Sequence, residues 1–326
     1  MPSEAVIEFN GATKDYGSTK RIGPVTFSVK SGEIVGFLGP NGSGKTTCIR
    51  LLLGLMRPTA GTVRIRGLDP VDRHASALRN VGYSPELPNL QAFLTPRELL
   101  SLVAKELEVS NSEAQKQIKD VLDLVGLSDY IDIKISKFSK GMVQRLSIAQ
   151  GMIGSPDILV MDEPMIGLDP AGSAHFREVF RDFSKQRGGT IFLSSHIMQE
   201  VESLCTSAVM IHSGRLLFSG PVDEIIANVL GSSYLVLEVE PLADSLVKLI
   251  SSLPGVEGIT NKTPGSAARG TLELKIEKGK EIRPVVADAV VRSGAKLYSM
   301  NYSENLLERT YIEALRQGKE MPESTP

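Results

Sequence analysis

The chain has 326 residues, 41% of them hydrophobic and 23% charged, which is the composition of an ordinary globular protein long enough for about two domains. The net charge of −2 and the absence of tryptophan provide neither a basic surface nor an aromatic stacking platform, so we expect no nucleic acid as a partner. No apolar run approaches the roughly 18 residues needed to span a bilayer, and residues 1–9 lack the apolar core of a signal peptide. We therefore expect a soluble chain that works at a membrane only through another polypeptide.

The first stretches of the chain predict strands. Residues 5–9 and 25–29 alternate between apolar and polar side chains, which indicates an antiparallel β-portion beside the core. Between them, Tyr16 stands directly before a glycine. Its ring could stack on an adenine ring or could anchor the turn, and the local sequence leaves both interpretations open.

A phosphate-binding loop follows. Residues 39–47 read G-P-N-G-S-G-K-T-T and match the P-loop pattern, after an apolar run at 34–38 and before a helix that we expect to begin near Cys48. The glycines let backbone N–H groups turn toward a phosphate chain, Lys45 should reach the β- and γ-phosphates, and the Thr46 hydroxyl should ligate Mg²⁺. The candidate nucleotide-binding residues are Gly39, Pro40, Asn41, Gly42, Ser43, Gly44, Lys45, Thr46 and Thr47.

Residues 92–152 predict a helical insertion in an α/β frame. A short strand at 62–65 precedes it, followed by a stretch at 81–86 that ends a strand and enters a loop. Thr95 and Ser110 each open a capping box with a glutamate three residues later, and Gly126 stands where the second helix should end.

An acidic pair follows the next apolar run. Residues 158–161 predict a buried strand that ends at Asp162 and Glu163. An acid at the tip of such a strand holds Mg²⁺ in P-loop enzymes, which suits Asp162, and Glu163 could serve as the general base for an attacking water. The alternative is a pair of solvated acids. Further strands at 190–193, 208–211 and 216–220 close a first domain at about residue 222.

The C-terminal part predicts a second, smaller α+β domain over residues 232–316. Its expected elements follow the order β-α-β-β-α-β of a ferredoxin-like fold, and residues 317–326 are expected to form a polar tail. This domain could stabilise a dimer or sense a small ligand, and no residue in it forms a candidate site.

The motifs together resemble those of an ATP-binding cassette (ABC) ATPase over about residues 5–222. The resemblance implies a P-loop cassette with a RecA-like core, an antiparallel β-subdomain and a helical subdomain. Residues 138–142, F-S-K-G-M, are similar to the family signature L-S-G-G-Q and keep Ser139 and Gly141. Ser139 can cap a helix whose N-terminus offers N–H groups to an anion. The resemblance implies that this anion is the γ-phosphate of ATP held by the opposite subunit.

Three further residues take roles from the resemblance. Asp169, in P-M-I-G-L-D, resembles the D-loop aspartate at the subunit interface, and His196 resembles the switch histidine that contacts the γ-phosphate. Glu86 stands where the family carries a glutamine, nine residues before Thr95, and could ligate Mg²⁺ through water. A glutamate at this place, the sequence S-K-G-M-x-Q-R and the C-terminal extension resemble the ATPases of ABC-2-type exporters.

The resemblance implies an ATP-hydrolysing subunit that requires Mg²⁺, pairs with a second copy and drives a separate membrane permease from the inner face of the membrane. Two alternatives stay open: a soluble ABC ATPase that acts on ribosomes or DNA, and a nucleotide-dependent sensor. The first class usually carries two cassettes or long insertions, whereas this chain has one P-loop. The presence of Glu163 and His196 argues against the second.

Five residues that could carry chemistry belong to no motif. Cys48 and Cys205 have neither metal nor redox spacing, and we expect reduced thiols in apolar surroundings. His74, His175 and His212 are expected to be surface or packing residues.

Overall fold

The computed structural model describes residues 5–17, 21–230, 232–264, 269–277, 280–302 and 306–317. These residues form two compact units, of which the first ends at Val222 and the second begins at Asp223. Among the described residues, no helix combines the length and the apolarity that crossing a bilayer requires.

A six-stranded sheet forms the centre of the first unit. Its strands in spatial order are β5 (Val81–Ser84), β6 (Ile158–Met161), β7 (Thr190–Ser195), β3 (Ile34–Leu38), β8 (Ser207–His212) and β9 (Arg215–Pro221). The first five run parallel, and β9 pairs antiparallel to β8. Every residue of β3, β6 and β7 is buried, as expected for parallel strands that are covered on both faces. The predicted α/β core is confirmed.

A smaller antiparallel sheet packs on this core, as predicted. It has the order β2 (Arg21–Lys30), β1 (Ala5–Asp15) and β4 (Ala60–Ile65), and its strands are longer than their alternating segments suggested. Its apolar side chains share one hydrophobic cluster with α1 (Lys45–Leu52), which begins at the P-loop lysine and therefore three residues earlier than expected.

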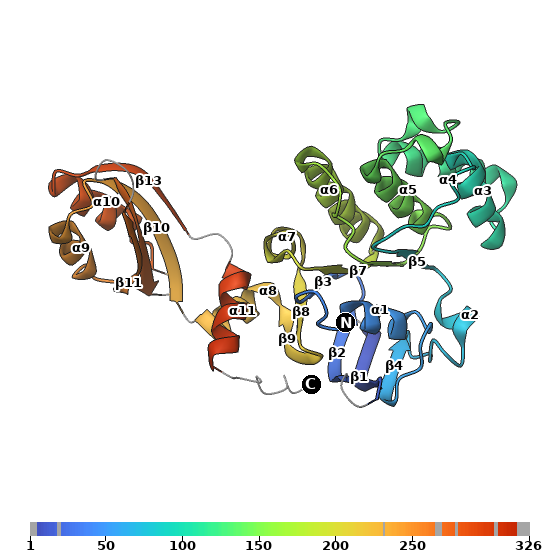
Figure 1. Ribbon diagram of the computed structural model, residues 1–326, viewed down its shortest axis with the longest axis horizontal. Helices are drawn as coiled ribbons and strands as arrows, with labels where there is room; N and C mark the ends of the chain where they lie inside the picture. Colours follow the sequence, from blue (N-terminus) through green and yellow to red (C-terminus); the bar gives the residue numbers. More distant parts are fainter. Residues whose placement is uncertain are drawn as a thin grey trace. The chain divides into compact units, whose positions relative to one another are not determined.

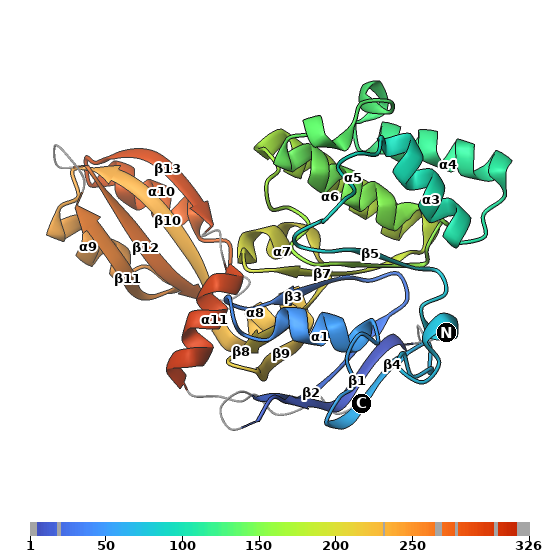
Figure 2. The same ribbon diagram turned by 45° about the vertical axis from the view of Figure 1, so that its right-hand side comes forward.

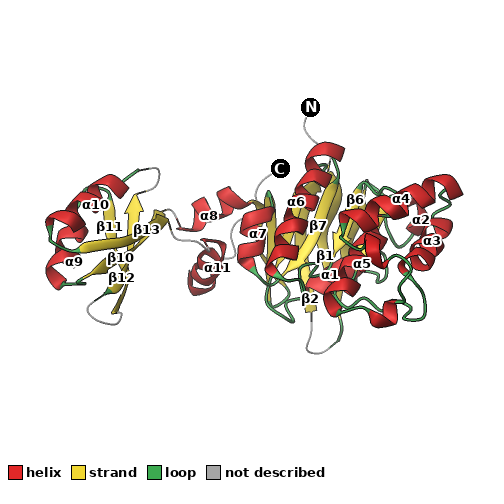
Figure 3. Ribbon diagram, turned by 90° about the horizontal axis from the view of Figure 1, so that it is seen from above, coloured by secondary structure: helices red, strands yellow, loops and turns green. Residues whose placement is uncertain are grey.

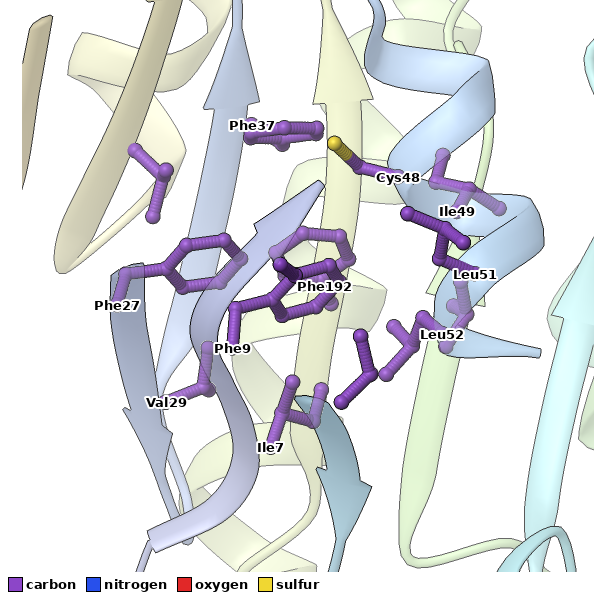
Figure 4. Packing of buried hydrophobic residues seen from close by; sticks show 14 of the residues in the cluster. Ile7, Phe9, Phe27, Val29, Phe37, Cys48, Ile49, Leu51, Leu52 and Phe192 are labelled. Atoms are coloured by element: carbon purple, nitrogen blue, oxygen red, sulfur yellow. The ribbon is translucent and has the colours of Figure 1, made fainter. Parts of the chain in front are cut away.

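Phenylalanine rings join the two sheets (Figure 4). Phe9 of β1 and Phe27 of β2 stack with ring centroids 4.6 Å apart. Phe192 of β7 lies 6.0 Å from Phe27 and 5.3 Å from Phe37 of β3. Each ring buries roughly 150–250 Å². The strand that leads into the P-loop is therefore held on this side by a tightly packed aromatic cluster.

Helices cover the opposite face of the six-stranded sheet. In two views, α5 (Lys140–Met152), α6 (Pro170–Arg187) and α7 (Met198–Leu204) lie on one side of the sheet and α1 on the other (Figures 1 and 2). Helices α6 and α7, and also the four-residue α2 (His74–Ala77), were not predicted from the sequence. For α6 a signal was present, because Asp169 caps the helix and a proline occupies its first turn.

The predicted helical region contains α3 (Pro96–Glu106), α4 (Asn111–Leu124) and α5, which lie together (Figure 2). Thr95 and Glu98 form the predicted capping box reciprocally. The box at Ser110 is only half formed: Ser110 accepts a hydrogen bond from the Glu113 N–H, but the Glu113 carboxylate accepts one from Gln117 instead.

The second unit has the expected element order. After α8 (Val222–Leu230), which was not predicted, come β10 (Ser232–Glu240), α9 (Asp244–Ser251), β11 (Val256–Pro264), β12 (Gly270–Glu277), α10 (Arg283–Arg292), β13 (Lys296–Tyr302) and α11 (Leu306–Gln317). The sheet order β11-β12-β10-β13, antiparallel throughout, is that of a split β-α-β arrangement. Strand β11 reaches Pro264, further than expected, and Gln317 ends α11 rather than beginning a tail. Residues 318–326 lie outside the described residues.

Helices α9 and α10 cover one face of this second sheet, and α11 contacts the other face. Leu246 of α9 and Val286 of α10 belong to one apolar cluster with the strands, and both helices lie on the same face (Figure 3). Side chains alternate along a strand, so Tyr234, next to the core residue Leu235, points to the other face. Arg309 of α11 stacks over the Tyr234 ring, 4.2 Å from its centroid, and α11 therefore covers part of that face.

Phe192→Ala should destabilise the first unit by about 3–5 kcal/mol, because it removes a fully buried ring from the aromatic cluster and leaves a cavity. Urea unfolding followed by circular dichroism measures the change. Phe93→Ala is the matched control, since that ring is 71% exposed and its loss should change stability by no more than about 0.5 kcal/mol. Equal effects of the two substitutions would contradict the packing described here.

Candidate functional site

The candidate site lies at the carboxyl edge of three adjacent strands. In the register of β3 with β7, Leu38 pairs with Ser195, and in that of β6 with β7, Met161 pairs with Leu193. The P-loop, the acidic pair and His196 directly follow these strands. Parallel strands end at the same edge of a sheet, so three segments from distant parts of the sequence meet there, where α/β proteins bind ligands.

The P-loop presents an uncapped helix terminus. Gly42 and Gly44 have φ angles of 81° and 113°, in the left-handed region that favours glycine. A Cβ on Gly44 would lie 2.7 Å from the Ile22 side chain, so glycine is required there by both conformation and space. Gly44 is also the N-cap of α1 and supplies no side-chain acceptor, so the first N–H groups of α1 are available to an anion.

A second observation in the loop fits a polar ligand. The Ser43 hydroxyl is buried and, among the described residues, has no hydrogen-bond partner. Its backbone N–H closes the loop by bonding to the Pro40 carbonyl at 3.1 Å. Asn41 is exposed, and Thr46 is half-buried in the first turn of α1. The loop therefore has the donors and the shape that a phosphate chain requires.

Lys45 lies at the centre of the buried charges. Its Nζ donates to the Gly39 carbonyl at 2.7 Å and lies 3.3 Å from Glu163 Oε1. Only 7% of the Lys45 side chain is exposed. A buried ammonium requires a partner, and Glu163 compensates its charge.

Glu163 also contacts His196, which was not predicted from the sequence. Its Oε2 lies 2.9 Å from His196 Nδ1, and its backbone φ of 49° lies in the left-handed region. Such a conformation in a residue with a Cβ costs on the order of 1–3 kcal/mol and persists only where its surroundings hold it. The structure thus brings Lys45, Glu163 and His196 into one chain of contacts.

Asp162 is buried beside a residue that the sequence analysis missed. The Ser194 hydroxyl donates to Asp162 Oδ1, and the Glu163 N–H donates to the Ser194 hydroxyl at 2.9 Å. Ser194 belongs to none of the motifs found in the sequence. Because the contact depends on β6 pairing with β7, no local signal in the sequence identifies it.

Glu86 is exposed in the loop after β5, the edge strand that pairs with β6. Burial raises the pKa of the Tyr83 phenol, and the negative charges of Asp162 and Glu86 raise it further. Glu86 thus adds negative potential near Asp162. Among the described residues, no three acidic, histidine or cysteine side chains gather as a ready-made metal site, so Thr46, Asp162 and Glu86 stay predicted Mg²⁺ ligands.

The signature residues make contacts within their own chain. Ser139 caps α5 by accepting a hydrogen bond from the Met142 N–H at 3.2 Å, as predicted. A Cβ on Gly141 would lie 2.9 Å from the Gly167 carbonyl oxygen, so glycine allows the signature helix to lie close to the loop at 164–169. Within the described part of the chain, the Ser139 hydroxyl bonds to this helix and not to residues 39–47.

Two side chains strengthen the contact between the signature helix and that loop. Gln144 donates to the Pro164 carbonyl at 3.3 Å, and Arg145 donates to Asp169 Oδ1 at 3.4 Å. Asp169 Oδ1 also accepts the Gly172 N–H and caps α6. Its predicted place at a subunit interface stays a prediction, and its contacts within the chain are structural.

Tyr16 lies beside the P-loop helix. Its hydroxyl is 3.2 Å from Thr47 Oγ1 and 3.3 Å from the Met56 sulfur, while 47% of the residue is exposed. The hydroxyl anchors the turn, and the ring still has an open face. The two interpretations drawn from the sequence are therefore compatible with each other.

The residues outside the motifs are structural. Cys48 and Cys205 are free and buried, and burial raises the pKa of both thiols, that of Cys48 to about 12. Neither forms an appreciable amount of thiolate at neutral pH. His74 and His175 hydrogen-bond to the carbonyls of Pro70 and Leu124.

Comparison with known proteins agrees with this geometry. A family model described as ABC transporter matches residues 22–166. The bacitracin transport ATP-binding protein BcrA of Bacillus licheniformis is 42% identical over 68% of this chain and 71% of that protein. The Nod factor export ATP-binding protein I of Paraburkholderia xenovorans is 38% identical over 77% of this chain and 83% of that protein. An uncharacterized ABC transporter ATP-binding protein of Bacillus subtilis, YhcH, is 31% identical over 97% of this chain and 98% of its own length, so that match includes the second unit.

Solved structures resemble the first unit. An ATP-binding subunit of an ABC transporter superposes with a TM-score of 0.63 at 32% identity, covering 68% of this chain and 92% of that one. The ATP-binding cassette MJ0796, in a dimeric post-hydrolysis state with ADP and Pi, has a TM-score of 0.61 at 23% identity, over 66% of this chain and 98% of that one. This second likeness concerns the fold alone.

Proposed function

The chain belongs to the family of ABC transporter ATP-binding proteins, and from this premise we propose that it powers an ABC-2-type exporter whose membrane permease is a separate polypeptide. It binds ATP with Mg²⁺ and hydrolyses ATP as the ATPase subunit of a transporter. The contact chain from Lys45 through Glu163 to His196 beside the P-loop supports ATP hydrolysis, and the similarity to export and transport ATP-binding proteins carries the exporter proposal.

The residues at the strand ends fit the nucleotide and its metal. We assign the phosphates to the N–H groups of residues 39–47 and to Lys45, and Mg²⁺ to Thr46 and Asp162, with Glu86 acting through water. The metal, when bound, neutralises charge on the phosphate oxygens. The buried orphan hydroxyl of Ser43 and the uncapped α1 terminus support this assignment. Tyr16 offers the half-exposed ring for the adenine.

Glu163 acts as the general base, and His196 orients it. Glu163 accepts the proton of the attacking water at a carboxylate oxygen, and His196 orients that carboxylate through Nδ1. His196 is partly exposed, so its ring can also reach the terminal phosphate. With a phosphate in the loop, Lys45 would donate to it rather than to Glu163, which would free the Glu163 carboxylate from the ion pair.

We propose that the complete site needs two copies of the chain. Ser139 and Gly141 present the N-terminus of α5, and Asp169 lies at the start of α6. These residues would close over the nucleotide of the partner. The MJ0796 cassette, which shares the fold, is dimeric, and we extend that arrangement to this chain by fold analogy alone.

An apolar groove in the helical region is the proposed docking site for a helix of the permease. It has a volume of about 430 Å³ and is lined mainly by side chains of α3 and the segment before it: Gln91, Phe93, Leu94, Leu99, Leu102, Val103, Glu106, Leu107 and Gln150. Phe93 and Leu102 are more than half exposed. We propose that a cytoplasmic helix of the permease fills this groove and holds the chain at the inner face of the membrane. Two relatives are named for bacitracin transport and for Nod factor export, which supports the exporter assignment, and no observation favours a ribosome, DNA or sensor role.

Glu163→Gln should lower ATP turnover by about 100- to 10,000-fold, because glutamine keeps the shape but cannot accept the proton. ATP binding should persist and the dimer should accumulate, which phosphate release, nucleotide titration and light scattering measure. Glu200→Gln is the matched control: this nearby half-buried carboxylate bonds to Ser195 and not to the P-loop. Undiminished turnover in Glu163→Gln would exclude Glu163 as the base.

Tyr16→Ala should weaken ATP binding by about 5- to 150-fold, because base stacking on an aromatic ring is worth about 1–3 kcal/mol. Tyr16→Phe removes the hydroxyl bond to Thr47 but keeps the ring, and it should bind ATP as the wild type does. Equilibrium titration with a fluorescent ATP analogue compares the two. If both variants bind alike, the ring does not stack on adenine.

Leu102→Glu and Phe93→Glu should reduce recovery of the chain with membranes of its native host by at least about tenfold, because docking would bury an unpaired carboxylate. The ATPase activity of the purified chain should stay unchanged, since neither side chain is in the site. Val291→Glu, at an equally exposed apolar position of α10, is the control and should be recovered normally. Normal recovery of the groove variants would place the permease elsewhere.

A further inference from the structure

Ser194 is a fully buried polar side chain between the two acids, and the mechanism above does not use it. Its Oγ makes two hydrogen bonds of opposite sense. It donates to Asp162 Oδ1 and accepts from the Glu163 N–H at 2.9 Å. Because a hydroxyl has a single hydrogen, these two bonds fix its orientation.

The sheet register places this hydroxyl. Met161 of β6 pairs with Leu193 of β7, so the next residues, Asp162 and Ser194, come level at the ends of the two strands. On its other side Ser194 pairs with Phe37 of β3, inside the aromatic-anchored part of the sheet. The hydroxyl thus lies at the end of a central strand that is paired on both sides, and it bonds to Asp162 and Glu163.

Each of the two bonds restrains a different acid. The bond to Oδ1 orients the Asp162 carboxylate, and among the described residues Asp162 Oδ2 accepts no hydrogen bond, so this second oxygen is available to a metal. The bond from the N–H holds the peptide of Glu163, whose φ of 49° is left-handed and must be held by its surroundings. That turn directs the Glu163 side chain to Lys45 and His196.

We propose that Ser194 is a positioning residue for ATP hydrolysis. It fixes the orientation of the Asp162 carboxylate, which holds Mg²⁺, and of the Glu163 peptide, which carries the general base. The inference rests on the proposed roles of Asp162 and Glu163. Ser194 touches neither nucleotide nor metal. Groups that orient metal ligands in this way typically change metal affinity or activity by about 10- to 100-fold when removed.

The test measures metal binding directly, apart from turnover. The full chain is saturated with a non-hydrolysable ATP analogue and titrated with Mn²⁺ in place of Mg²⁺, and electron paramagnetic resonance reports the free ion. Ser194→Ala should raise the Mn²⁺ dissociation constant by about 10- to 100-fold. Binding of the same analogue in the presence of EDTA should stay unchanged, because the P-loop contacts do not involve Ser194.

Two further variants separate positioning from folding. Ser194→Cys has nearly the same size and a weaker hydrogen-bonding group, so it should fold and show a smaller rise than alanine; it carries the comparison if Ser194→Ala does not fold. Ser147→Ala is the matched control, since its hydroxyl is also buried and bonds to the Ser84 hydroxyl at 2.8 Å without touching either acid. It should leave the Mn²⁺ dissociation constant unchanged.

Asp162→Asn distinguishes failure of this inference from failure of the proposed site. If Asp162→Asn weakens Mn²⁺ binding and the Ser194 variants do not, Ser194 has no positioning role although Asp162 holds the metal. If neither position affects Mn²⁺, the metal assignment fails and the inference fails with it. An equal rise in Ser147→Ala would also overturn the inference, because the effect would then report only the loss of a buried hydroxyl.

Discussion

The site depends on one constraint, that a charge removed from water must be paired. Lys45, Asp162 and Glu163 are all buried at the carboxyl edge of the sheet. Lys45 and Glu163 compensate each other's charge, and the Ser194 hydroxyl donates a hydrogen bond to the Asp162 carboxylate. Removing one partner of such a pair typically costs about 3–5 kcal/mol, because the other charge stays buried alone. Each of these side chains therefore determines where the others lie, and an incoming phosphate must exchange with partners that already exist.

The supporting structure is rigid where the chemistry needs precision. Phosphoryl transfer gains most of its rate from positioning and electrostatics, so the groups must be held before the reaction begins. The rings of Phe27, Phe37 and Phe192 anchor the strands that lead into the P-loop and into His196. Close packing in such a core resists small displacements of the strands, so the loops are restrained where they join the strand ends.

The contacts between the signature helix and the loop at 164–169 link two parts of the proposed dimer interface. Gly141 approaches the Gly167 carbonyl, Gln144 reaches the Pro164 carbonyl, and Arg145 reaches Asp169. This loop begins directly after Glu163. A displacement of α5 by a permease or a second cassette would therefore be transmitted to the chain next to the general base, through contacts that are all made within one copy.

Local patterns in the sequence determined much of this protein. The P-loop, the apolar strand before Asp162, the cap at Ser139 and the β-α-β-β-α-β order depend on neighbouring residues, whose chemistry can be read directly. Helix α6 was not predicted, although Asp169 as N-cap and Pro170 in the first turn are typical of a helix start. Tertiary structure alone decided the bonds of Ser194 to the two acids and the left-handed turn at Glu163. These features arise where strands β6, β7 and β3 come together, and a linear sequence does not record which strands pair.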